Sequence, residues 1–122
     1  MAFVTYSQLG KMGQMCNQIF ELMSSIGIAV KNDLFYAFPD WKYQEYFINP
    51  LPNCRDFIET HKTPFKTIKE DAFTYEDVKL DPYYNYDIQG YRQSYKYWEP
   101  HAAELVKKYL EPTKEVLDNI KE

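Results

Sequence analysis

The chain has few of the features that would indicate nucleic-acid binding, a membrane span or secretion. Only two arginines occur, Arg55 and Arg92, and the net charge is −4, so no basic patch for nucleic acid is expected. No stretch approaches the roughly 18 apolar residues that a membrane-spanning helix needs. The first residues are not a basic segment followed by an apolar run, so no signal peptide is predicted.

Cysteine is also scarce, which limits both disulfides and metal sites. Cys16 and Cys54 form no CxxC pair and no zinc spacing, and no cluster of histidine, cysteine and carboxylate has metal-ligand spacing. We therefore expect no metal and two free, buried thiols in a reducing compartment. A cytoplasmic location follows from this expectation and from the absence of a signal peptide.

The residues that are present indicate a folded α/β domain. The chain has 122 residues, of which 45% are apolar and 26% charged, and this fits one domain with one core. Aromatic residues make up 18%, with twelve tyrosines. Tyrosine packs its ring while its hydroxyl seeks a partner, so this content suits an aromatic core or a cleft that binds sugars or peptides.

The first forty residues alternate between strand and helix patterns. Residues 2–6 are short, apolar and β-branched, which predicts a strand, and a glycine-bearing turn follows over 7–13. A helix is predicted over 14–31 and a second buried strand over 34–38 before a proline. One face of that helix carries the apolar residues Met15, Ile19, Leu22, Met23, Ile26 and Val30. This order predicts a βαβ unit, whose parallel strands need the helix as a crossover.

The rest of the chain is less regular. We expect one domain over 1–122, made of the βαβ core (1–38), an irregular middle (39–87), and a strand with C-terminal helices (88–122). The middle has helical hints at 41–47 and 55–60, short strands near 65–68 and 73–78, and a turn-rich run at 81–87. A strand is predicted over 88–94, a helix from Pro100 to Tyr109, and another helix after Pro112.

The glycine turn before the long helix is the main candidate site. Glycines between a strand and a helix N-terminus let backbone N–H groups approach a phosphate. Gly10 and Gly13 have neither the dinucleotide-binding spacing nor that of a P-loop, so the residues alone indicate a weak anion site. The alternative is an ordinary tight turn in which Asn17 and Gln18 bond the backbone.

Several strings in the sequence resemble family 11 glycosyltransferases, the α-1,2-fucosyltransferase-like enzymes. The turn string is similar to Gly-x-Leu/Met-Gly-Asn-Gln-Met/Ile-Phe, which in that family also follows the first strand. Later strings resemble the end of the family's first helix, the segment after its second strand, and its Gly-Tyr-x-Gln-Ser-x-Lys-Tyr-Phe string. In order, the matching segments are 13–20, 26–29 with 31–32, 38–47 with 51–52, and 90–98. The resemblance covers the N-terminal part of such an enzyme.

The resemblance implies a fold, a reaction and a set of site residues. It implies the Rossmann-like, acceptor-side half of a two-domain GT-B enzyme, a parallel sheet flanked by helices. The reaction would be inverting, metal-independent transfer of fucose from GDP-fucose to an acceptor glycan, with no further cofactor. By the resemblance, three turn residues lie near the diphosphate of the sugar donor, namely Gly13, Asn17 and Gln18. Three others form the wall of the acceptor cleft, namely Tyr91, Gln93 and Ser94.

Two departures from the family limit what the chain is expected to do alone. Cys16 stands where the family usually has its second glycine, and a side chain there would crowd a backbone that must lie close to phosphate. The family's His-x-Arg-Arg-x-Asp string, which supplies the diphosphate-binding arginine, is absent from the chain. We therefore expect the chain to be inactive without a C-terminal nucleotide-binding half, and to associate with that half or with itself. The alternative is a non-catalytic α/β domain that binds a glycan, nucleotide or protein.

Overall fold

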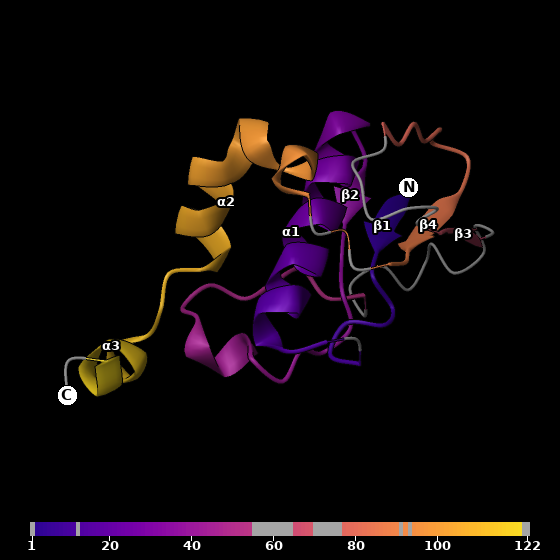
Figure 1. Ribbon diagram of the computed structural model, residues 1–122. Coiled ribbons are helices and arrows are strands. Elements are labelled where there is room, and N and C mark those ends of the chain that lie inside the picture. Colours follow the sequence, from indigo (N-terminus) through magenta and orange to yellow (C-terminus); the bar gives the residue numbers. More distant parts are fainter. Residues whose placement is uncertain are drawn as a thin grey trace.

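A parallel sheet organises the structure. The computed structural model describes residues 2–11, 13–54, 65–69, 77–90, 92 and 94–120. Its strands are β1 (Phe3–Thr5), β2 (Phe35–Tyr36), β3 (Phe65–Ile68) and β4 (Asn85–Ile88). They pair in the order β2-β1-β4-β3, and every pair is parallel (Figure 1). The described chain is therefore an α/β fold, as the sequence predicted.

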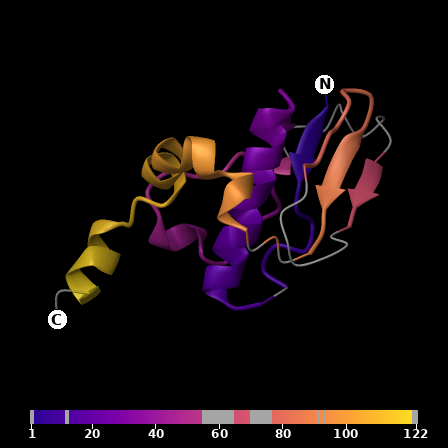
Figure 2. The same cartoon turned by 45° about the horizontal axis from the view of Figure 1, so that its top comes forward.

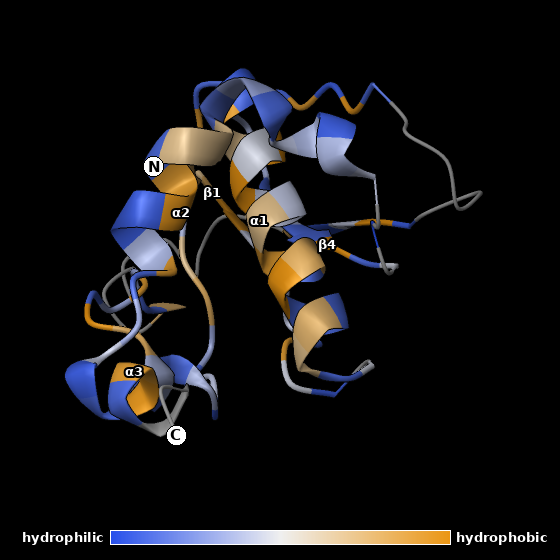
Figure 3. Ribbon diagram, turned by 60° about the vertical axis from the view of Figure 1, so that its left-hand side comes forward, coloured by the Kyte–Doolittle hydropathy of each residue, from blue (hydrophilic) through white to orange (hydrophobic). Residues whose placement is uncertain are grey.

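The helix α1 (Met15–Lys31) connects β1 to β2 and confirms the predicted βαβ unit. Its apolar residues continue along most of its length (Figure 3), and Leu22, Met23 and Ile26 are completely buried. They pack in one core with Val4 of β1 and with Tyr86 and Ile88 of β4. The aromatic residues Phe38, Trp41, Tyr97, Trp98 and Tyr109 join the same core. Much of the aromatic content therefore serves packing.

The C-terminal part of the chain is helical. The short turns η3 (Tyr95–Tyr97) and η4 (Glu99–His101) lead into α2 (Ala102–Tyr109), and α3 (Lys114–Ile120) follows Pro112. Both predicted helices are thus present, although Pro100 lies in the 3₁₀ turn before α2. Figure 1 places α1, α2 and α3 on one side of β1, β4 and β3. Within the described ranges, no helix has both the length and the apolar character to cross a membrane.

Several boundaries differ from the sequence-based predictions. The strand predicted over 88–94 is wrong, because β4 begins at Asn85, inside the run predicted as turns, and ends at Ile88. The strand predicted at 65–68 is confirmed as β3. The helical hint at 41–47 corresponds to a single 3₁₀ turn, η1 (Gln44–Tyr46). The predicted helix at 55–60 and most of the predicted strand at 73–78 lie outside the described residues.

Candidate functional site

The carboxyl ends of the strands meet at the edge of the sheet where α1 begins, as the strand arrows in Figure 2 show. The glycine turn that starts at Ser7 leaves β1 at this edge, and the chain after Ile88 leaves β4 there. Because β2 lies on one side of β1 and β4 on the other, the strand order switches between β1 and β4. In open α/β sheets, ligands bind at the carboxyl edge beside such a switch point.

Side chains join the two segments that meet at the switch point. The Asp87 carboxylate accepts a hydrogen bond from the Ser7 amide at 2.8 Å and another from the Ser7 hydroxyl at 2.5 Å. The Tyr6 hydroxyl donates to the Gly90 carbonyl at 2.5 Å. These bonds fix the start of the glycine turn against the end of β4.

Gly13 and Asn17 lie in contact at the end of the glycine turn. Gly13 has a φ of 81°, which L side chains rarely adopt. A Cβ atom at Gly13 would also lie 2.7 Å from both Cβ and Nδ2 of Asn17, so no other residue fits there without movement. Asn17 is half-buried, and its amide has no hydrogen-bond partner among the described residues. The Asn17 amide is thus positioned over the turn and available to a ligand.

Gln18 differs from Asn17 because both ends of its amide are used inside the protein. Its Nε2 donates to the Gly13 carbonyl at 3.0 Å, and its Oε1 accepts from Nε1 of Trp41 at 3.0 Å. The predicted alternative, in which the turn's amides bond the backbone, is confirmed for Gln18. The side chain is completely buried, so it holds the turn in shape and ties it to the segment after β2. The sequence gives no signal for this role, because Trp41 lies 23 residues away.

Cys16 lies in the first turn of α1 and is exposed, which corrects the expectation of a buried thiol there. Cys16 is not one of the described residues with a positive φ, so position 16 does not require glycine. Any crowding of the turn can therefore come only from the Cys16 side chain, and that side chain faces solvent.

Cys54 is a free, half-buried thiol beside the Thr5 hydroxyl, and burial raises its pKa.

The segment after β4 packs closely on α1. A Cβ atom at Gly27 would lie 2.0 Å from the Tyr97 carbonyl oxygen, so only glycine allows this approach. The Ser24 hydroxyl donates to the Arg92 carbonyl at 2.8 Å. Ser94 is half-buried and caps η3 by accepting from the Lys96 amide at 3.3 Å. The other predicted cleft residues, Tyr91 and Gln93, lie outside the described residues.

Arg92 is completely buried and holds the end of the sheet together. Its guanidinium donates to the carbonyls of Gln89 at 2.9 Å and Ile68 at 3.0 Å, and to the Tyr97 hydroxyl at 3.2 Å. These bonds connect the ends of β3 and β4 to η3. The guanidinium is therefore a structural cation, and it does not face a phosphate site.

Glu21 is a completely buried acid one helical turn beyond Asn17. Neither of its carboxylate oxygens has a hydrogen-bond partner of good geometry in the structure. Burial raises the pKa of Glu21 from its ordinary 4.5 to about 7, and the nearby Tyr6 hydroxyl offsets part of this rise. The sequence gives no signal that separates Glu21 from the chain's exposed acids.

A closed loop, residues 39–52, surrounds a cavity. Its ends meet because Phe38 pairs with Asn53, and the Phe38 amide donates to the Pro52 carbonyl at 2.9 Å. We call residues 39–52 the pocket loop. The cavity inside it has a volume of about 670 Å³ and is lined by residues of the loop and its two closing neighbours. Its polar lining residues are Asp40, Lys42, Gln44, Glu45 and Asn53.

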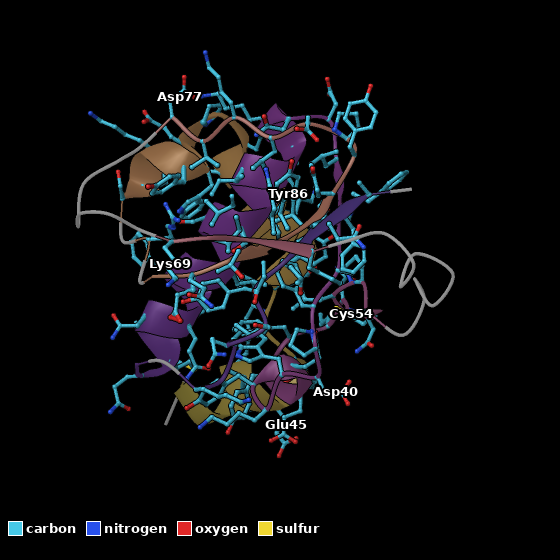
Figure 4. The ribbon with its side chains drawn as sticks, turned by 90° about the vertical axis from the view of Figure 1, so that its right-hand side faces the viewer. Asp40, Glu45, Cys54, Lys69, Asp77 and Tyr86 are labelled. Atoms are coloured by element: carbon cyan, nitrogen blue, oxygen red, sulfur yellow. The ribbon has the colours of Figure 1, made fainter. Side chains whose placement is uncertain are left out.

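Three acidic residues of the described chain lie at different ends of the sheet. Asp40 and Glu45 lie at the carboxyl edge, whereas Asp77 lies at the opposite end (Figure 4), where it pairs with Lys31. No group of three or more metal-binding side chains occurs within the part of the chain that is described.

Comparisons of the chain with protein-family models, with curated proteins and with solved structures each found no match.

Proposed function

We propose that the chain is the acceptor-side, N-terminal half of a GT-B glycosyltransferase similar to the family 11 fucosyltransferases. Such an enzyme moves fucose from GDP-fucose to a hydroxyl of an acceptor glycan. The observation that carries the proposal is the convergence on α1 of the strings that resemble the family. The string 13–20 contacts 38–47 through Gln18 and Trp41, and 26–29 contacts 90–98 through Gly27 and Tyr97.

This convergence supports the proposal because it gathers the strings around one helix, α1, beside the carboxyl edge of the sheet. Each contact also depends on residue types inside the strings. The Gln18 amide needs a donor such as the Trp41 indole, and the Tyr97 carbonyl needs a glycine at position 27. The parallel sheet with a glycine turn at its carboxyl edge is also what a Rossmann-like half requires.

Within this proposal the residues of the glycine turn have different roles. Asn17, with its unused amide, donates to the diphosphate of the sugar donor, and Gly13 allows the backbone to approach it. Gln18 positions Gly13 and Asn17 through its hydrogen bond to the Gly13 carbonyl. Ser94, with Tyr91 and Gln93, contributes to the acceptor side.

Transfer also requires a fixed cation at the diphosphate, and Arg92, the arginine that the described ranges include, is used inside the fold. Negative charge develops on the departing diphosphate, and fixed positive groups stabilise it in the transition state. The buried guanidinium of Arg92 is already bonded to two carbonyls and a hydroxyl. We therefore propose that a second, nucleotide-binding half supplies this cation, and that this chain alone binds the sugar donor weakly.

Titration of the ¹⁵N-labelled chain with GDP-fucose tests the proposal. We expect millimolar binding, with shifts confined to the amides of the glycine turn and the first turn of α1, and we expect Asn17→Ala to abolish them. Asn49→Ala is a matched control, because its amide bonds the Lys108 carbonyl away from the turn. Unchanged turn signals at about 10 mM, a concentration that corresponds to a free energy of about −3 kcal/mol, would contradict the contact with the sugar donor. Micromolar binding would contradict the need for a second half.

A further inference from the structure

The pocket loop is held closed from inside and outside. Inside it, the Gln44 amide donates to the Asn49 carbonyl at 3.1 Å and accepts from the Leu51 amide at 3.0 Å. Outside it, the segment between α2 and α3 bonds the loop backbone at Tyr46 and Ile48. A compact loop with paired ends and internal bonds is a common carrier of function. The cavity is therefore a fixed feature of the fold.

The lining of the cavity has two kinds of surface. Trp41, Leu51 and three prolines provide apolar walls, and the Trp41 ring is stacked on Phe47 at 5.8 Å. The polar groups include the carboxylates of Asp40 and Glu45, and the Asn53 amide orients Asp40 with a 2.8 Å hydrogen bond. Glu45 has no hydrogen-bond or ion-pair partner in the described part of the chain. Apolar walls with a few oriented polar groups are typical of small-molecule sites.

Charge and shape select the class of ligand. Among the described residues of the lining, two carboxylates stand against one ammonium, that of Lys42, and this excess of negative charge opposes a phosphate or a sugar nucleotide. Carboxylate and amide oxygens accept hydrogen bonds from hydroxyls, and the proline and leucine surfaces suit the C–H faces of a sugar ring. The volume of about 670 Å³ lies in the range of small-molecule pockets.

We propose that the cavity of the pocket loop binds a neutral saccharide, whose hydroxyls bond the carboxylates of Asp40 and Glu45. Trp41 connects this cavity to the glycine turn, because its indole bonds Gln18, which in turn bonds the Gly13 carbonyl. The saccharide would then lie beside the turn that approaches the diphosphate. Its identification as the acceptor of transfer rests on the proposed function, whereas its binding does not.

The indole signals of the chain provide a direct test. The sequence has two tryptophans, so an ¹⁵N spectrum resolves Trp41 in the pocket from Trp98 against η3. We expect lactose, maltose or N-acetylglucosamine, each titrated to about 50 mM, to move the Trp41 indole and the amides of the pocket loop. The Trp98 indole is expected to stay in place.

Conservative variants distinguish a site from a general solvent effect. Asp40→Asn and Glu45→Gln keep the shape of the side chains, and each is expected to weaken saccharide affinity about tenfold by removing a charged acceptor. Glu104→Gln on α2 is the matched control and is expected to bind as the unmodified chain does. An unmoved Trp41 indole with all three saccharides would overturn the proposal, and so would equal shifts in all variants.

A titration with the anionic ligand GDP distinguishes this proposal from the proposed function. GDP is expected to leave the Gln44 side-chain amide unmoved, because its hydrogen bonds are to Asn49 and Leu51 inside the pocket loop, and movement of that signal by GDP as well as by saccharide would contradict a neutral site. If saccharides bind the cavity while GDP-fucose leaves the glycine turn unchanged, the saccharide site stands and the transferase role fails. If GDP-fucose moves the turn and no saccharide moves Trp41, the pocket proposal alone fails.

Discussion

At the scale of single residues, Glu21 makes the stability of the fold depend on pH. In the folded chain its pKa is about 7, whereas in the unfolded chain it is near 4.5. Between these values the folded state holds a proton that the unfolded state has lost, so the free energy of unfolding falls as pH rises from about 4.5 to 7. Above pH 7 both states are ionised, and the loss is complete.

Glu21→Gln is therefore expected to stabilise the chain only at higher pH. The variant cannot ionise, so it keeps the neutral side chain that burial favours. We expect equal stability of the two proteins near pH 4.5 and a gain for the variant of about 3 kcal/mol at pH 8, measured by urea unfolding. Glu104→Gln, an exposed control, is expected to show no such difference. An equal gain at both pH values would mean that charge at Glu21 is not the cause.

Sequence reasoning identified the glycine turn but not the partners of its side chains. Gly13 and Asn17 were recognised because they belong to a local string, and the structure places them in contact. The bond from Trp41 to Gln18 and the closure of the pocket loop by Phe38 and Asn53 join residues far apart in sequence. Contacts of this kind form only when distant segments are brought together by folding, so a local sequence pattern does not predict them.

At the scale of elements, local periodicity predicted the βαβ unit well but misplaced β4. The apolar spacing of α1 defines a helix regardless of its neighbours, so its predicted bounds were almost correct. Asn85 and Asp87 are turn formers by composition, yet they lie in a strand paired on both sides. The Asn85 side chain accepts a hydrogen bond from the Phe3 amide at 3.0 Å, so it is part of the sheet. Tertiary pairing here overrides local propensity.

The contact between α1 and η3 depends on Gly27. An added Cβ atom would lie 2.0 Å from the Tyr97 carbonyl oxygen and 2.9 Å from Cα of Trp98, and both of these are backbone atoms that cannot rotate away. We expect Gly27→Ala to lower the free energy of unfolding by about 2–3 kcal/mol, as overpacking does, although alanine favours the helix itself. Chemical unfolding measures the loss.

A matched control lies two residues earlier in the same helix. Ser25 is completely buried, and its hydroxyl bonds the Glu21 carbonyl within α1. Ser25→Ala is expected to cost about 1 kcal/mol or less. A Gly27→Ala variant as stable as the unmodified chain would show that η3 can move away from α1. The close contact between Gly27 and Tyr97 would then not be required for the fold.

At the scale of the whole molecule, the described helices lie on one side of the sheet and α1 packs against it, while aromatic residues lie on the other face. Phe3 lies on the face opposite Val4, because side chains alternate along a strand, and its side chain is buried there. Phe35 is its register partner on β2, and Phe65 on β3 contacts its ring at 5.7 Å. Phe35 is 55% exposed and Phe65 50% exposed, both on edge strands of the described sheet. Edge strands with exposed aromatic residues favour association with another chain.

We therefore expect the isolated chain to self-associate through this face. Phe35→Lys with Phe65→Lys places charge on both edges and is expected to keep the chain monomeric, because burying two ammonium groups in an interface is unfavourable. Sedimentation velocity over a wide concentration range measures the effect. Tyr83→Lys is the control: this ring is 76% exposed, in the turn before β4, and its replacement is expected to leave association unchanged. A monodisperse unmodified chain at every concentration would contradict the prediction, because the aromatic face would then be stable in water without a partner.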